Sequence, residues 1–203
     1  MRKISKKGNR CNLVTFSAMI GIVCICAACA APKVPLYRST QWNPASVQNI
    51  AVLPVLDARL DRTEEINIER FILKPAAKKI RGRGYQSGTL STWGAFPINH
   101  IEQVKRITPE QVRQLGPQTI QYVFLVALMD VKSEMGFGSS GNAEVAAWLF
   151  DKQTGTAVWY DKGIGQYGQG GLAGMMVKGL MGEAAVESAM SDLFRAFPSR
   201  SGS

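Results

Sequence analysis

The placement of the cysteines is the feature that most limits what this chain can fold into. All four of them, Cys11, Cys24, Cys26 and Cys29, lie in the first thirty of 203 residues. The rest of the chain therefore has no disulfide and no thiolate metal cage. The whole sequence is 46% hydrophobic and 19% charged, which excludes a disordered chain, so an apolar core must hold the fold together.

The positive charge of the chain is concentrated at its start. The sequence has 24 Lys and Arg residues against 15 Asp and Glu, a net charge of +9. Five of the basic residues lie in the first ten positions, and without them 19 basic residues remain against the 15 acidic ones. Because the excess lies mainly in a segment typical of removable leaders, the charge does not indicate a nucleic-acid partner.

Residues 1–28 have the three parts of an export signal. A basic start is followed by an apolar run over residues 13–26 and by small residues at Ala27 and Ala28. An apolar run of about 14 to 16 residues is short for a membrane span, which needs about 20. The sequence therefore predicts a cleaved signal peptide rather than a retained transmembrane anchor.

The end of this signal, Cys26-Ala27-Ala28-Cys29, resembles the lipobox of bacterial lipoproteins. The resemblance implies cleavage between Ala28 and Cys29 and a diacylglyceryl group on Cys29. Acyl chains would anchor the protein firmly, since each buried methylene contributes about 0.8 kcal/mol. This sequence departs from the lipobox at Cys26, where Leu is usual. Ordinary cleavage behind the small residues is the alternative, and it would give a soluble periplasmic protein.

The residue after Cys29 bears on the choice of membrane. In the sorting rule that the lipobox resemblance implies, Asp at this position favours retention in the inner membrane. Here the residue is Ala30, which implies the outer membrane, with the domain facing the periplasm. Residues 29–48 then read as the lipidated cysteine and a tether, because they contain three prolines and no strand or helix period. About 19 extended residues would span about 60 Å.

Residues 49–203 predict a single periplasmic α/β domain. The predicted strands are residues 49–56, 85–89, 122–131, 143–151 and 156–166, with a Gly/Ser loop over residues 136–142. The predicted helices are residues 63–83 with a kink at Pro75, 99–106, 108–116 and 172–197. The order β-α-β-α-β-β-β-α predicts a mixed sheet of about five strands, its last three an antiparallel meander, with helices covering the sheet.

With these elements in order, the chain resembles a family of bacterial outer-membrane lipoproteins of unknown function, typified by a neisserial vaccine candidate. The motifs that carry the resemblance are Leu73-Lys74-Pro75, Arg83-Gly84-Tyr85, Thr154-Gly155 and Trp159. The domain of this family is similar to the amino-terminal domain of TolB and to the periplasmic part of CsgG-type proteins. The resemblance covers most of residues 29–197 and implies an envelope protein that assembles with others or assists a transport or export complex. It supplies no catalytic residue.

Glycines form two groups near the end of the chain. Residues 163–168 match G-x-G-x-x-G, but no strand follows the last helix and no acidic residue stands at a strand end about 20 residues further on, so dinucleotide binding is not indicated. Small residues on a helix let another backbone come close, either inside the domain or between copies of the chain. The residues of this second group, a candidate interface, are Gly170, Gly171, Gly174, Gly179 and Gly182.

Charged residues after the first predicted strand form a second candidate site. Asp57 and Asp61 lie where open α/β sheets bind ligands. Arg59 and Arg62 alternate with them, which predicts a loop whose charges neutralise one another.

The remaining candidates are single residues. His100 is the only histidine, so a hydrolase would depend on it alone, and a histidine metal site lacks partners. Trp93 and Phe96 could anchor a partner, although burial against the sheet is the simpler prediction.

The first functional hypothesis is a non-enzymatic outer-membrane lipoprotein that acts as an assembly or accessory subunit of an envelope transport or export complex. Its partners would be the membrane, through the acyl chains on Cys29, an envelope protein complex, and further copies of itself. It would need no cofactor, no metal and no nucleic acid. The alternative is a lipoprotein that reaches across the periplasm to regulate a cell-wall synthase. A small hydrolase that uses His100 is the third hypothesis.

Overall fold

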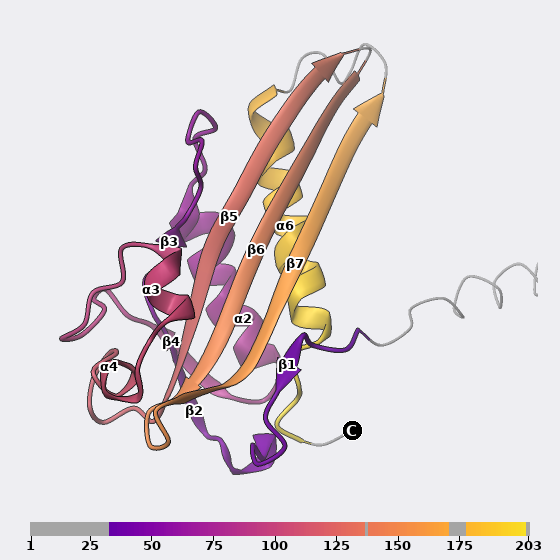
Figure 1. Ribbon diagram of the computed structural model, residues 1–203. Helices are drawn as coiled ribbons and strands as arrows, with labels where there is room; N and C mark the ends of the chain where they lie inside the picture. The colour runs from indigo at the N-terminus through magenta and orange to yellow at the C-terminus, as the bar shows by residue number, and fades with distance from the viewer. Residues whose placement is uncertain (1–32, 137, 171–177, 202–203) are drawn as a thin grey trace, which may run out of the picture. The chain divides into compact units, whose positions relative to one another are not determined.

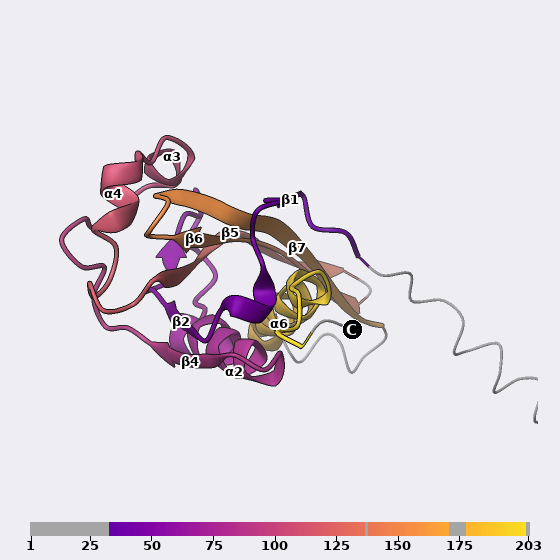
Figure 2. The ribbon, with the colours of Figure 1, turned by 90° about the horizontal axis from the view of Figure 1, so that it is seen from below.

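The computed structural model describes residues 33–136, 138–170 and 178–201. These residues form a mixed α/β structure with one sheet of seven strands and helices on both of its faces (Figures 1 and 2). The strands are β1 (Tyr37–Arg38), β2 (Asn49–Val52), β3 (Leu56–Asp57), β4 (Gln86–Thr89), β5 (Tyr122–Gly136), β6 (Gly138–Asp151) and β7 (Thr156–Gly170). The helices are η1 (Pro44–Ser46), η2 (Glu69–Leu73), α2 (Lys74–Gly82), α3 (Ile101–Lys105), α4 (Pro109–Arg113) and α6 (Lys178–Arg195).

The sheet is mixed, as predicted, and its strand order is β1-β7-β6-β5-β2-β4. β2 lies parallel to both β4 and β5, while β5, β6 and β7 form the predicted antiparallel meander. The prediction of about five strands was too low, because it omitted β1 and counted β2 and β3 as one strand. β3 also pairs with β5, where Leu56 lies opposite Ala127. The break between β2 and β3 contains Pro54, which has no backbone N–H to donate to a ladder.

The segment predicted as a tether is docked on the domain over its described part. Tyr37 of β1 pairs with Tyr160 of β7. Trp42 and Val47 are buried, with 6% and 0% of their surface exposed. The folded domain therefore begins well before residue 49, and the apolar side chains of a proline-rich segment account for its docking.

The helix predicted over residues 63–83 begins later and changes its pitch. Asn67 caps its start, because its side-chain oxygen accepts from the Arg70 backbone N at 2.9 Å. The first turns are a π-helix, in which the Lys74 backbone N donates to the Glu69 carbonyl. A wider turn here relieves the clash that Pro75 would make with the carbonyl four residues before it, so the predicted kink takes the form of a π-turn.

α4 begins where the sequence predicts. Thr108 Oγ1 accepts from the Gln111 backbone N at 3.4 Å, and Gln111 Oε1 accepts from the Thr108 backbone N at 2.9 Å. This reciprocal pair is a capping box, and Pro109 occupies the first helical position.

The Gly/Ser segment predicted as a loop over residues 136–142 belongs largely to the sheet. β6 begins at Gly138, and the register with β5 continues to the pair Gly136 and Gly138. Gly141 has a packing reason to be glycine, because a Cβ there would overlap the Met181 carbonyl of α6. The small residues thus allow α6 to pack closely against the long strand β6. The local Gly/Ser composition alone does not reveal this packing.

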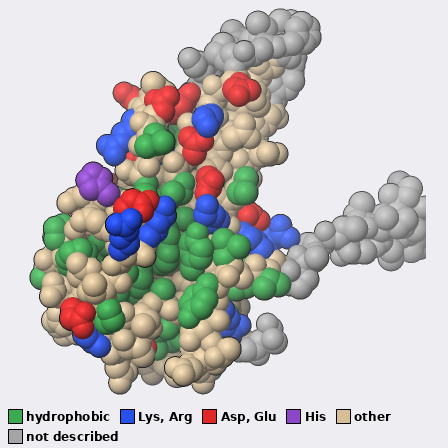
Figure 3. All heavy atoms as spheres, in the orientation of Figure 1, with side chains coloured by type: hydrophobic (Ala, Val, Ile, Leu, Met, Phe, Trp, Pro, Cys, Tyr) green, Lys and Arg blue, Asp and Glu red, His purple; other side chains and the backbone are tan. Residues whose placement is uncertain are grey.

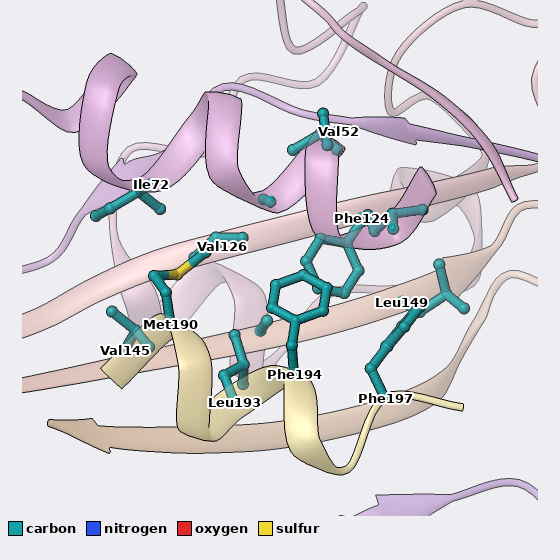
Figure 4. Packing of buried hydrophobic residues seen from close by; sticks show 14 of the residues in the cluster. Val52, Ile72, Phe124, Val126, Val145, Leu149, Met190, Leu193, Phe194 and Phe197 are labelled. Carbon is teal, nitrogen blue, oxygen red and sulfur yellow. The ribbon is translucent and has the colours of Figure 1, made fainter. Parts of the chain in front are cut away.

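The sheet has a core on each face. Figure 2 shows α2 and α6 on one face and α3 and α4 on the other. On the α6 side, Phe124 of β5 contacts Phe194 and Phe197, with ring centroids 5.7 and 5.4 Å apart (Figure 4). On the other side, the neighbours Val123 and Leu125 of β5 pack in a second cluster. This strand is therefore buried on both faces, which explains its unbroken apolar run.

The backbone of α6 lies directly against glycines of the sheet. A Cβ on Gly163 would overlap the Ala189 carbonyl oxygen, and one on Gly165 would overlap that of Ala185. Gly141 of β6 faces the same helix. We call these three residues the glycine contact. It explains why the sequence is rich in glycine within strands, where glycine is otherwise unfavourable.

We expect Gly165→Ala to lower the free energy of unfolding by about 1–3 kcal/mol, because the added methyl group must push α6 off the sheet. Gly168→Ala on the same strand is the matched control. The nearest described atom to a Cβ there is Ser139 O at 4.0 Å. Its effect should stay within about 0.5 kcal/mol. Urea denaturation measures both, and an equal loss in the two variants would contradict the glycine contact.

Candidate interaction surface

The outer edge of β7 is largely unpaired within the described residues. β1 pairs with β7 only at Trp159 and Tyr160. Over residues 161–170, no other strand of the described chain pairs with this edge. Such an edge presents a row of N–H and C=O groups that can pair with another strand.

The first part of this edge is capped by side chains. Lys33 Nζ donates to the Lys162 carbonyl, and the Ile164 backbone N donates to Asp192 Oδ2 at 3.3 Å. Alternation along the strand turns the N–H and C=O of Gln166 to the same side. The open edge therefore begins at Gln166.

Lys33 also joins two carboxylates. Its Nζ lies 3.1 Å from Asp161 Oδ2 and 2.9 Å from Asp192 Oδ2. Asp161 is only 1% exposed, so its charge depends on this ion pair for compensation. The three residues, which we call the Lys33 triad, fasten the docked amino-terminal segment to β7.

The face of the long strands opposite α6 carries an aromatic row. Tyr37, Tyr160 and Trp148 lie opposite one another on β1, β7 and β6. The rings of Tyr160 and Trp148 stack with centroids 5.0 Å apart. Partial burial raises the pKa of the Tyr160 hydroxyl. Figure 3 shows hydrophobic side chains gathered on this face of the molecule.

Next to this row lies a mixed patch at the same edge. Ile164 of β7 is 63% exposed on this face. Tyr167 is 45% exposed on the opposite face, because it pairs with Gly141, which faces α6. Lys162 Nζ pairs with Glu144 Oε1 at 2.6 Å, and this bond raises the pKa of Lys162. An exposed apolar patch rimmed by a charge pair is typical of protein interfaces. We call the aromatic row, this patch and the open edge of β7 together the β7 surface.

Basic residues dominate a different surface, between α2 and α6. A hollow of about 700 Å³ there is lined by five cations, Arg70, Lys74, Lys78, Lys79 and Arg81. Burial, with Arg83 and Lys78 nearby, lowers the pKa of Lys79. Much of the positive excess of the domain therefore lies on α2.

The predicted anchor and part of the predicted glycine interface fall outside the described residues. These are Ala28, Cys29, Gly171 and Gly174. Gly170 is the last residue of β7, and Gly179 lies in the first turn of α6. Gly182 packs inside the domain, because a Cβ there would lie 3.1 Å from Val131 and 3.3 Å from Ser133 Oγ.

The G-x-G-x-x-G run of residues 163–168 lies in the middle of β7 rather than in a loop. Its first two glycines belong to the glycine contact with α6. The glycine pattern in this segment thus has a packing explanation, and β7 continues past residue 166, where the sequence predicted its end.

The charged loop after β3 neutralises itself, as its alternating sequence predicted. Arg59 Nε and Nη2 donate to the two Asp57 carboxylate oxygens, each at 2.8 Å. This paired contact lowers the pKa of Asp57. Arg62 donates to the Asp57 carbonyl, and Asp61 Oδ1 accepts from the Thr63 backbone N.

The single-residue candidates occupy structural positions. His100 precedes α3 and is exposed, and its backbone N donates to Gln103 Oε1 at 3.0 Å. Trp93 and Phe96 are half-buried against the second core cluster. Within the described ranges, no three His, Cys, Asp or Glu side chains lie close enough together to hold a metal ion. No helix in these ranges has the length and apolar character needed to cross a membrane.

Comparisons with known proteins give only a likeness of fold. Lipoprotein GNA1162 from Neisseria meningitidis is 19% identical and matches 66% of this chain and 94% of its own, with a TM-score of 0.45. The PelC dodecamer from Paraburkholderia phytofirmans is 14% identical over 79% and 95%, with a TM-score of 0.42. Protein XCC0632 from Xanthomonas campestris, of the DUF330 family, is 11% identical over 81% and 88%, with a TM-score of 0.40. No family model and no curated protein matches the chain. Values this low carry no argument about function.

Sequence reasoning missed most of the β7 surface. Lys33 lies in a segment read as a tether, and its partners Asp161 and Asp192 are far away in the sequence. One signal was available: with Gly163 and Gly165 on the covered face of a strand, the residues between and before them must face outward. That alternation assigns Tyr160, Lys162 and Ile164 to the open face.

We expect Lys33→Met to lower the free energy of unfolding by about 3 kcal/mol, because it leaves the Asp161 charge buried without a partner. Adding Asp161→Asn should restore part of the loss. Lys105→Met is the control, since Lys105 pairs with Glu102 at 2.6 Å on the surface. Its cost should be below about 1 kcal/mol. Denaturant unfolding decides the matter, and equal costs for the two lysines would contradict a structural Lys33 triad.

Proposed function

We propose that this chain is a lipoprotein of the bacterial outer membrane whose periplasmic domain acts without catalysis as an assembly or accessory subunit of an envelope transport or export complex. The β7 surface carries the proposal, because it combines an open strand edge with a half-buried aromatic row. Cys29, in its lipobox-like context, supplies the anchor. Similarity to TolB and CsgG-type domains stays a prediction from the sequence motifs.

The occupant that we propose for the β7 surface is a second copy of this chain. Beyond the two residues that β1 covers, β7 forms one edge of the sheet, and β4 forms the other, so one chain carries two different strand edges. Pairing of β7 in one copy with β4 in the next would be a head-to-tail contact, which can close into a ring. Strand addition gives affinity through the backbone, and the side chains of Ile164 and Tyr167 would add specificity.

The alternative, a regulator of a cell-wall synthase, needs a long free tether. The described part of the tether, from Lys33 onward, is docked through β1, Trp42 and Val47. The reach of about 60 Å that extended residues would give is therefore not available to the docked form. The hydrolase hypothesis has no observation in its favour, since His100 is exposed and stands at the N-cap of α3.

Replacing Cys29 tests the anchor. In Cys29→Ala the acyl chains are lost, so the protein should leave the membrane fraction while its domain stays folded. Cys26→Ala is the matched control, because it keeps the lipidated position and should remain with the membrane. Cell fractionation with immunoblotting measures both, and protease resistance reports the fold. Firm membrane attachment of Cys29→Ala would refute a lipid anchor at this residue.

Replacing Gln166 tests the self-assembly. Gln166→Pro removes the first outward N–H of the open edge, and we expect it to reduce the assembled mass of the detergent-extracted lipoprotein to that of a monomer. An edge position facing outward tolerates proline, so the domain should stay folded. Gln166→Ala keeps the N–H and should assemble like the parent. Light scattering after gel filtration gives the mass. A monomeric parent, or a proline variant that assembles normally, would rule out the β7 edge.

A further inference from the structure

The docking of the amino-terminal segment leaves very little free chain behind the anchor. Lys33 is held by the Lys33 triad, and only four peptide steps separate it from Cys29. Four residues span at most about 14 Å when fully extended. If Cys29 carries acyl chains, Lys33 cannot lie far above the lipid headgroups.

The surface next to Lys33 is apolar and exposed. Val34 is 80% exposed, Leu36 63% and Tyr37 48%. Three large apolar side chains within four residues are unusual on a surface that faces water. Aliphatic and aromatic side chains of this kind are suited to the boundary between headgroups and acyl chains.

Beside these residues lies a hollow that is lined by cations. It measures about 610 Å³. No acidic residue is among the described residues that line it, and its five basic ones are Lys33, Arg38, Arg83, Arg195 and Arg200. We call it the arginine hollow.

Two cations of the arginine hollow have acidic partners outside its wall, because Arg195 Nη1 lies 3.6 Å from Asp192 Oδ1 and Lys33 belongs to the Lys33 triad. Arg83 and Arg38 are held in other ways. Arg83 Nη2 donates to the Phe194 carbonyl at 2.6 Å, and its Nη1 lies 3.5 Å from Ser199 Oγ. Arg38 lies over the Trp42 ring, 5.7 Å from its centroid. Arg38 and Arg200 form no ion pair with the described acidic residues, so both can neutralise a phosphate.

We propose that this face of the domain lies on the membrane that holds the anchor. Val34 and Leu36 enter the headgroup region, and the arginine hollow binds the phosphate of an anionic phospholipid. The inference rests on the proposed lipidation of Cys29. It assigns the domain one orientation on the lipid surface, which an anchor on a long tether would not impose.

Depth-dependent quenching tests this orientation in the intact lipoprotein. All four cysteines lie at or before position 29, so the processed chain has no thiol apart from the lipidated one. Val34→Cys therefore carries a single fluorescent label, and Leu60→Cys, whose Leu60 is fully exposed in the loop after β3, is the matched control. Both are reconstituted into vesicles of phosphatidylcholine and phosphatidylglycerol that contain a lipid with a nitroxide near the headgroup.

We expect the label at position 34 to be quenched at least about threefold more strongly than the label at position 60. Equal quenching in a protein that floats with the vesicles would overturn the docked orientation while the anchor stands. A protein that does not associate with membranes at all would overturn the anchor, and the orientation with it.

Charge reversal tests the arginine hollow separately. In the Val34→Cys background, Arg38→Glu with Arg200→Glu should lower the quenching about twofold in vesicles with phosphatidylglycerol. Arg113→Glu, on exposed α4, should leave it unchanged. In vesicles of phosphatidylcholine alone the double variant should differ little from its parent. An unchanged signal in the anionic vesicles would overturn the assignment of the hollow to an anionic headgroup.

Discussion

The glycine contact between α6 and the sheet is the constraint on which the rest of the domain depends. Because Gly163 and Gly165 have no side chain, the backbone of α6 approaches β7 as closely as its own carbonyls allow. Because α6 packs so close to the sheet, Phe194 and Phe197 contact Phe124, and the three rings fill the core at the C-terminal end of the helix (Figure 4). The fit is made of backbone and therefore tolerates little added volume.

The same contact determines the opposite face of the strand. Side chains alternate along β7, so a row of glycines on the covered face leaves the intervening positions to solvent. Those positions hold Tyr160, Lys162 and Ile164. The two-residue alternation of the strand therefore accounts both for the close packing of α6 and for the residues of the β7 surface. The close packing of α6 also lets the Asp192 side chain accept a hydrogen bond from the Ile164 backbone N at the edge of the sheet. Helix position and edge protection are thus coupled.

Much of the fold follows from local patterns, and the exceptions have physical causes. The meander over residues 122–166, the capping box at Thr108 and the pairing of Asp57 with Arg59 were predictable, since each depends on neighbours in the sequence. The two-residue β1 was not, because its pairing with β7 and the anchoring of Lys33 join positions more than a hundred residues apart. The prediction of a loop at residues 136–142 was wrong, because the small residues there allow α6 to pack closely on the sheet.

The Lys33 triad links the docked segment to the edge that the domain offers to others. Lys33 occupies the outward carbonyl of Lys162, and Asp192 occupies the N–H of Ile164, so a strand that adds to β7 can pair only from Gln166 onward. Cys29 precedes Lys33 by only four residues in the sequence. Any lipid anchor there would hold the capped end of β7 near the membrane. The open end would then be the part left free for another copy.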